Sequence, residues 1–341
     1  MTAGPAARAL RAHVETWRPY TLWYVGLVGL GGAALLDGPH HPWRLAAAWA
    51  APTAGWVGGH YLGDYFDREL DAGSKPHRPI PSGRLAARTA LWCGCACFAV
   101  LAGLAAAGGW ATASVAVAGA LGIVAYSRWF KARGAAGNLV RGALGAVALF
   151  YGAAAAGLRP AAGLPAGRTI AALVVLVIAF WLHDTASNLV GTLRDIDGDR
   201  AGGYQTLPVL RGTSFAVTTV LALYVAAIAA ALAGGLLAGR GQADFLVTLV
   251  LAATIGVAAL TPLPVHRAQM PVAVALRAHS VLVIERVVLA SAVVGLGLGV
   301  AWQLGLAVPM VALTWWTQSQ MRRRHELGSA TPTLPAPAQF P

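Results

Sequence analysis

The sequence predicts an all-α protein that crosses a membrane many times. Of its 341 residues, 57% are hydrophobic and only 11% are charged, whereas soluble domains carry about 25% charged residues. Apolar runs long enough for a membrane helix recur along the whole chain, and such runs are typical of α-helical spans rather than β-barrels. The basic residues gather in alternate loops, as the positive-inside rule expects. We therefore expect a polytopic bundle of nine transmembrane helices, with a short tenth apolar run after them.

The apolar segments follow one another in a clear order. The first is entered through Trp17 to Tyr20, where a proline at the first turn and aromatics at the headgroup level fit a helix that enters a membrane. Glycines, prolines and charged residues separate the later segments, and the loop 72–84 contains too many of them to be a simple helix. The expected spans are 20–36, 44–62, 86–107, 110–127, 139–157, 169–190, 213–238, 243–262 and 272–302.

The C-terminal third leaves two choices open. Glu285 and Arg286 lie near the middle of the ninth segment, so we expect its membrane part to begin around Val281 or later. The run Leu304–Trp316 is short and contains Pro309, so it is either a short tenth crossing or a re-entrant piece. The expected domains are a cytoplasmic N-terminal segment (1–19), a transmembrane domain (20–318) and a tail that is basic and then disordered (319–341).

The net charge of +12 does not indicate nucleic-acid binding. The basic residues form no patch interleaved with aromatics, and they lie between spans, where they face anionic lipid. If the N-terminus is cytoplasmic, seventeen basic residues fall in inner segments and four in outer ones. We therefore expect a multi-pass protein of the cytoplasmic membrane, with its N-terminus inside, membrane lipid as a partner and no nucleic acid.

The acidic residues carry the chemical signal. More than half of the thirteen fall in two short stretches, each at the cytoplasmic end of an expected span. In the first stretch, Asp64, Asp67 and Asp71 are spaced i, i+3 and i+7, which places them on one face of a helix. Three carboxylates on one face repel each other, and they are tolerated when positive charge, usually a divalent metal, lies between them.

In the second stretch, Asp195 and Asp199 share a helix face and Asp197 points elsewhere. Two opposed acidic faces suit Mg²⁺, a hard cation that prefers carboxylate oxygens, water and phosphate. Mg²⁺ held by carboxylates usually also binds a diphosphate. An apolar cavity behind such a site is typical of an enzyme that binds a prenyl diphosphate. The expected metal ligands are Asp64, Asp67, Asp71, Asp195, Asp197 and Asp199.

The motifs resemble those of the UbiA superfamily of intramembrane prenyltransferases. The stretch GDYFDRELDAGSKPHRPIPSGR looks like the first aspartate-rich motif of that family, and DIDGDRAGGYQTLPV is similar to the second. The resemblance covers roughly 17–300. It implies a nine-helix bundle, a Mg²⁺-dependent diphosphate site and transfer of a prenyl group to an acceptor that is often aromatic. The family usually has Asn before the first Asp, where this chain has Gly63.

Residues around the two stretches complete the candidate site. We expect Asp64, Asp67, Asp71, Asp195 and Asp199 to be catalytic. Lys131 and Arg78 are placed to neutralise diphosphate oxygens, Arg18 to hold an acceptor carboxylate, and Asp184 is a functional candidate because it lies inside a span. The expected substrate-binding residues are Lys131, Arg78, Asn188, Arg141, Tyr126, Arg18 and Asp184.

The main hypothesis is a prenyltransferase that ionises a prenyl diphosphate and lets a small-molecule acceptor capture the cation. A terpene cyclase would ionise the same substrate at the same site, and Gly63 keeps that alternative open; dependence on an acceptor separates the two. A transporter or lipid-binding protein is the non-enzymatic alternative. Transporter charges gather near the bilayer midplane, whereas these acidic stretches lie at one end of the spans, which favours an enzyme.

Overall fold

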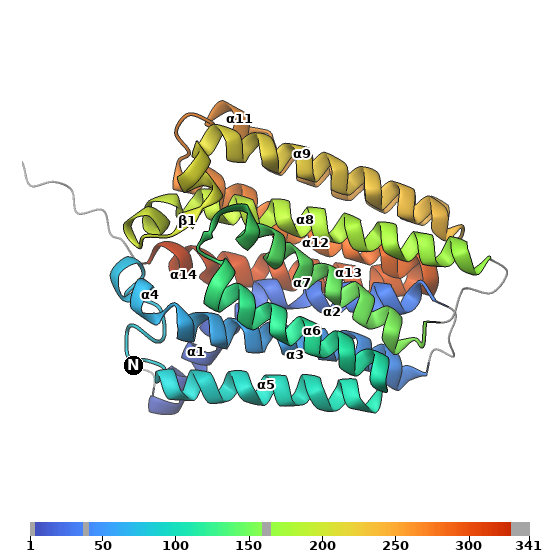
Figure 1. Cartoon of the computed structure of the whole chain (residues 1–341), viewed down its shortest axis with the longest axis horizontal. Coiled ribbons are helices and arrows are strands. Elements are labelled where there is room, and N and C mark those ends of the chain that lie inside the picture. The colour runs from blue at the N-terminus through green and yellow to red at the C-terminus, as the bar shows by residue number, and fades with distance from the viewer. Residues whose placement is uncertain (1–3, 37–40, 159–164, 329–341) are drawn as a thin grey trace, which may run out of the picture.

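The computed structural model describes residues 4–36, 41–158 and 165–328. Within these residues the only strand is the two-residue β1 (Gln205–Thr206), so the prediction of an all-α bundle is confirmed. The long helices run side by side along one axis, and α4, α14 and β1 lie together at one end of the bundle (Figure 1). We call this the polar end.

The bundle consists of long helices joined by short turns. Its helices are α2 (Leu22–Ala34), α3 (Pro42–Phe66), α5 (Ala87–Ala107), α6 (Trp110–Ala125), α7 (Gly134–Ala155), α8 (Ala166–Ala201), α9 (Leu207–Ala238), α10 (Gln242–Leu260), α12 (Val272–Leu298) and α13 (Val300–Thr317). The shorter elements are α1 (Pro5–Trp17), α4 (Arg68–Ser74), α11 (Pro262–Val265), α14 (Arg323–Leu327), a 3₁₀ turn (Pro19–Thr21) and two π-helical turns (Tyr126–Phe130 and Gln318–Arg322).

The outer surface of the bundle is that of a membrane protein. Among the described residues, 8 helices are long and apolar enough to cross a membrane. Large apolar side chains on the outer helices are exposed, for example Trp92 (72%), Trp110 (83%) and Val247 (72%). A soluble protein rarely exposes apolar side chains on this scale, but lipid solvates them well. The chain is therefore a multi-pass membrane protein.

Helix α2 forms the centre of the core. Its residues from Tyr24 to Ala34 are all buried, as expected for a helix that is apolar on every side. It has only 13 residues and is not among the 8 candidate spans. Glycines let it approach its neighbours: a Cβ on Gly29 would clash with the Ala48 carbonyl of α3, and one on Gly32 with the Leu149 carbonyl of α7. Small residues at such contacts are typical of membrane helices.

The ninth expected segment (272–302) corresponds to helix α12 (Val272–Leu298). Helix α12 runs without interruption from Val272, and Glu285 and Arg286 are buried inside the bundle. Glu285 accepts hydrogen bonds from Tyr224 (3.3 Å) and lies 2.7 Å from Nε2 of His183. Partners inside the bundle thus satisfy the charge of Glu285, and the expectation that the membrane part begins around Val281 or later stays a prediction.

The last apolar run is longer than the sequence suggested. Helix α13 continues through the π-helical turn into α14, and the whole stretch Val300–Leu327 has 28 residues. At 1.5 Å per residue it is about 42 Å long, which exceeds the hydrocarbon thickness of about 30 Å. This length suits a full tenth crossing rather than a re-entrant piece. The helix also passes the boundary expected at 318, and the disordered tail expected beyond it falls mostly in 329–341, outside the described residues.

Candidate active site

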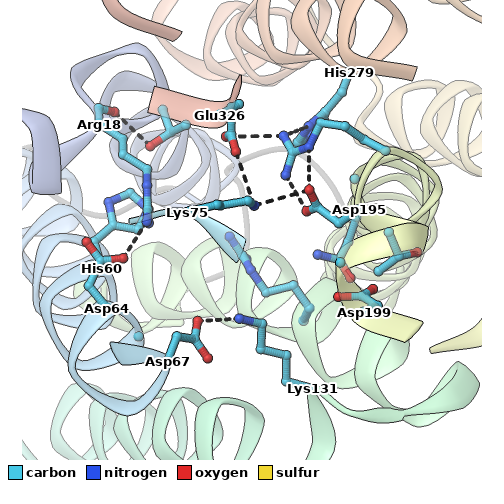
Figure 2. Close-up of a pocket in the computed structure, with 18 of the residues that line it drawn as sticks. Arg18, His60, Asp64, Asp67, Lys75, Lys131, Asp195, Asp199, His279 and Glu326 are labelled. Carbon is cyan, nitrogen blue, oxygen red and sulfur yellow. Dashed lines mark hydrogen bonds and ion pairs between the residues drawn. The ribbon is translucent and has the colours of Figure 1, made fainter. Parts of the chain in front are cut away.

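A cavity of about 510 Å³ opens at the polar end, between the two acidic stretches. Its walls come from α3, α4, α7, α8 and α12, and from the C-terminal end of the last helix. Every site residue expected from the sequence lines it: Arg18, Asp64, Asp67, Asp71, Arg78, Tyr126, Lys131, Arg141, Asp184, Asn188, Asp195, Asp197 and Asp199. Segments more than 100 residues apart in the sequence are thus brought around one space (Figure 2).

The first acidic stretch faces the cavity as its spacing predicted. Asp64 lies in the last turn of α3, Asp67 lies at the junction, and Asp71 lies on α4. Because α3 and α4 follow one another almost without a break, the three carboxylates stay on one face and all are buried. Arg18 pairs with Asp64, and Lys131 pairs with Asp67. In Figure 2, Arg18 and Asp64 lie at the left of the site, and Asp67 and Lys131 lie at the bottom.

The second acidic stretch lies on an extension of α8 beyond the core. The helix continues to Ala201, so Asp195 and Asp199 share a face as predicted. Asp195 binds Arg194 at 2.6 Å and Lys75 at 3.2 Å. Asp197 lies off this face: its side chain is 82% exposed and pairs with Arg200 at 3.6 Å. Asp197 therefore lies at the rim and is the weakest candidate ligand of the three.

Buried cations hold the carboxylates apart. In the described part of the chain, no group of three or more His, Cys, Asp or Glu side chains is placed to hold a metal ion. Arg78 instead forms two hydrogen bonds to Asp71, at 2.9 and 3.1 Å. Burial alone would lower the pKa of Arg78, but Asp71, Glu326 and Asp64 outweigh it and raise the pKa. Burial likewise opposes the charge of Lys131, and Asp67 restores it and raises the pKa.

The donor set nevertheless fits a hard cation. The carboxylates of both stretches face one cavity, and Oδ2 of Asp64 is buried without a hydrogen-bond partner among the described residues. A buried carboxylate oxygen in that state has an unused lone pair for a ligand. To bind a metal ion, these carboxylates would have to leave their present cation partners. A diphosphate is an anion that could then bind those cations.

The deeper wall of the cavity combines Arg141 and Asp184, which the sequence predicted, with Arg286, which the sequence did not assign to the site. Arg141 lies over the Trp56 ring at 4.0 Å from its centroid, and Arg286 lies over the Tyr24 ring at 4.5 Å. Tyr24 also donates a hydrogen bond to Asp184 at 2.9 Å. The signal for Arg286 was its position in an apolar run, which marks an intramembrane charge with a function.

The C-terminal helix also reaches this site. Arg322 and Glu326 line the cavity, and His325 accepts a hydrogen bond from Nε of Arg18 at 2.9 Å. The sequence analysis assigned 319–341 to a tail that is basic and then disordered. No local pattern indicates contacts that span about three hundred residues, so only the structure reveals this part of the site.

The fold and the site together define an integral-membrane enzyme of the class that acts on prenyl diphosphates. The chain belongs to the UbiA prenyltransferase family, whose model matches residues 24–261. The resemblance found in the sequence motifs is therefore confirmed.

Comparisons with individual proteins also point to this family. The chain is 35% identical over 255 residues to a digeranylgeranylglyceryl phosphate synthase of Ignicoccus hospitalis, covering 75% of this chain and 82% of that protein. The apo structure of a UbiA homolog from Aeropyrum pernix is similar in fold (TM-score 0.67, 20% identity, 80% of this chain and 96% of that one). So is a UbiA homolog from Archaeoglobus fulgidus bound to GPP and Mg²⁺ (TM-score 0.60, 14% identity, 90% and 99%).

Proposed function

We propose that the protein transfers a prenyl group from a prenyl diphosphate to a small-molecule acceptor, with Mg²⁺ held at the polar end. The observation that carries this proposal is that both acidic stretches line one cavity and pair with lysines from other segments, Asp67 with Lys131 and Asp195 with Lys75. An acidic helix end at a solvated surface would not need lysine and arginine partners from distant segments. A diphosphate site needs both the carboxylates and the cations.

The prenyl chain would lie on the apolar side of the cavity. A second, smaller hollow of about 50 Å³ lies between α3, α5, α6 and α7 and is lined almost wholly by apolar side chains. Trp56, Ile123 and Leu144 line both spaces. A substrate with its diphosphate at the polar end would thus extend its hydrocarbon chain past Trp56 into this hollow, where burial of apolar surface stabilises it.

The donor chemistry supports Mg²⁺ as the cofactor, as in the structure of the Archaeoglobus fulgidus homolog. The residues to hold it are Asp64, Asp67, Asp71, Asp195 and Asp199. When bound, Mg²⁺ neutralises negative charge that grows on the diphosphate as it leaves. Lys131 and Arg78 bind the outer oxygens of the diphosphate and orient it. The C–O bond breaks with its electron pair going to the diphosphate, and an acceptor nucleophile then bonds to the allylic carbon and releases a proton.

We infer that the acceptor is anionic and of the glycerol phosphate type. The curated relatives are named as digeranylgeranylglyceryl phosphate synthases. In this chain Arg141 and Arg286 line the cavity against aromatic rings, and among the described residues neither forms an ion pair with a carboxylate. A buried guanidinium without a carboxylate partner favours an anionic ligand. Arg18, the acceptor clamp expected from the sequence, is already paired with Asp64.

Product analysis tests the function. Purified protein with Mg²⁺ is given geranyl, farnesyl or geranylgeranyl diphosphate, with and without geranylgeranylglyceryl phosphate, and the extract is examined by mass spectrometry. We expect a product only with the acceptor. Cyclic terpenes formed without any acceptor would refute the transferase proposal and favour the cyclase alternative.

A matched pair of variants tests the acceptor class. Arg286→Gln is expected to raise the KM for the acceptor about tenfold or more, with a smaller effect on the KM for the prenyl diphosphate. Arg211→Gln is the control, because Arg211 also lies over a ring (Phe215, 5.6 Å) but is exposed outside the cavity. Equal effects of Arg286→Gln on both KM values would contradict the assignment.

We also propose that the polar end lies on the cytoplasmic side, because the basic residues concentrate in the segments at that end. The three native cysteines lie in α5 and are replaced first. A single cysteine is then placed at Ser82, in the loop at the polar end, or at Asp244, at the start of α10. A membrane-impermeant thiol reagent added to intact cells should label the cysteine at 244 and spare the one at 82. The reverse pattern would refute this orientation.

A further inference from the structure

The C-terminal helix α14 places its own carboxylate among the cations of the site. Glu326 lies 3.1 Å from Arg194, 3.3 Å from Arg78 and 3.7 Å from Lys75. Its side chain is only 8% exposed. Figure 2 shows Glu326 pointing down from the last helix toward Lys75, on the side of the cavity that faces Asp195. We call Lys75, Arg78 and Arg194 the cation triad.

The cation triad joins the two halves of the site. Lys75 and Arg78 follow the first acidic stretch, and Arg194 precedes the second. Asp71 and Asp195 neutralise part of this charge. Glu326 supplies the third carboxylate, and it is the member of the cluster that comes from outside both motifs. Buried cations at this density require an anion beside them, since an unpaired buried charge costs several kcal/mol.

A diphosphate would need the same space and the same cations. Arginine and lysine bind carboxylate and phosphate oxygens with similar geometry. A diphosphate held between Asp71 and Asp195 would meet the cation triad at the N–H groups that Glu326 now binds. Two anions at that distance in a buried site repel strongly, so the triad serves Glu326 or the substrate but not both.

The local structure of α14 allows such an exchange. The helix has five residues, follows the π-helical turn Gln318–Arg322, and ends at Gly328, whose φ is +71°. Loosely wound π turns occur frequently at functional sites. Hydrogen bonds also hold this end: Arg322 donates to His279 at 2.8 Å, His77 bonds the His325 carbonyl at 2.9 Å, and Arg18 donates to His325 at 2.9 Å. Arg322 lies over the Tyr20 ring, 5.2 Å from its centroid. The match to the family model ends at residue 261, so α14 lies beyond the matched region.

We propose that the cation triad is an oxyanion site for the substrate diphosphate, that Glu326 occupies it when substrate is absent, and that the diphosphate must displace Glu326 to bind. This inference rests on the proposed function, because it takes the prenyl diphosphate as the ligand. It assigns a role to Lys75 and Arg194 that the motifs did not indicate. It also makes the C-terminal helix a tethered competitor of the substrate.

The first test measures binding of inorganic pyrophosphate with Mg²⁺ to the full-length protein by calorimetry in detergent. Glu326→Gln keeps the shape of the side chain and removes its charge. We expect it to bind pyrophosphate about tenfold more tightly and to lower the KM for prenyl diphosphate by a similar factor, as for one lost charge-assisted contact. Glu69→Gln is the control of equal charge change, because Glu69 is 86% exposed and does not line the cavity. An affinity that is unchanged or weaker in Glu326→Gln overturns the proposal.

The second test does not depend on a variant that folds. Hydrogen–deuterium exchange of the wild-type protein is followed in peptides that cover 318–328, with and without pyrophosphate and Mg²⁺. Displacement of Glu326 predicts faster exchange in these peptides and slower exchange in 64–78. Slower exchange in both would mean that α14 closes over the ligand, which overturns the proposal. If the wild type turns over prenyl diphosphate but both tests fail, only this inference is lost; if it binds no pyrophosphate and makes no product, the proposed function fails.

Discussion

Variants of Asp64 can distinguish a structural role of this carboxylate from a catalytic one. Its side chain is 6% exposed and that of its partner Arg18 is 17% exposed. Loss of one member of a buried ion pair costs 3–5 kcal/mol because the other charge is left unpaired. Since Arg18 retains some exposure, we expect Asp64→Asn to lower the free energy of unfolding by about 3 kcal/mol. Turnover should fall at least 100-fold, roughly the effect of one electrostatic group at a reacting centre.

The double variant Arg18→Gln/Asp64→Asn distinguishes the two effects. It removes both charges, so most of the lost stability should return, as measured by thermal unfolding in detergent. Turnover of prenyl diphosphate should stay low, because the carboxylate proposed to hold Mg²⁺ is still missing. Recovery of turnover together with stability would refute the reasoning, since Asp64 would then serve only to neutralise Arg18.

Three further predictions follow from particular residues. A Cβ at Gly63 meets nothing within 4 Å, so Gly63→Asn should fold and reach half-maximal activity at a lower Mg²⁺ concentration; a higher requirement would contradict its place beside the metal ligands. Glu285→Gln leaves His183 and Tyr224 without their carboxylate and should lower the free energy of unfolding by about 3 kcal/mol, with the KM for prenyl diphosphate unchanged because Glu285 does not line the cavity. Excess EDTA should abolish turnover while the melting temperature changes little, because Lys131 and Arg78 neutralise the carboxylates without metal; unfolding on chelation would contradict this.

The fold was predictable from the sequence because long apolar runs report which segments can span a membrane as helices. The expected spans at 86–107 and 213–238 match α5 and α9 closely at the C-terminal end. The acidic faces were predictable for a similar reason. Helical spacing decides which side chains share a face. Helix α3 passes almost directly into α4, and α8 stays helical to Ala201.

Contacts between distant segments were not predictable. Nothing beside Lys75 in the sequence indicates that Asp195 lies 3.2 Å away. Arg286 in an apolar run has the same local pattern whether it ends a span or lines a cavity, and only packing against Tyr24 and Trp56 decides between them. Glu326 follows a run of arginines, and such a run indicates a cytoplasmic segment whether or not it folds back onto the site.

The pairing of Asp67, Asp71 and Asp195 with cations bears on how the site functions. Carboxylates this close would repel each other in the absence of metal, and the bundle would lose stability at the polar end. Lys131, Arg78 and Arg194 prevent this by binding Asp67, Asp71 and Asp195. Under the proposed function, Asp67, Asp71 and Asp195 would hold Mg²⁺ while Lys131, Arg78 and Arg194 bind the diphosphate oxygens, so neither set of charges would be left unpaired. The site is therefore organised for an exchange of partners, and a ligand that brings only the metal or only the diphosphate should bind far more weakly than both together.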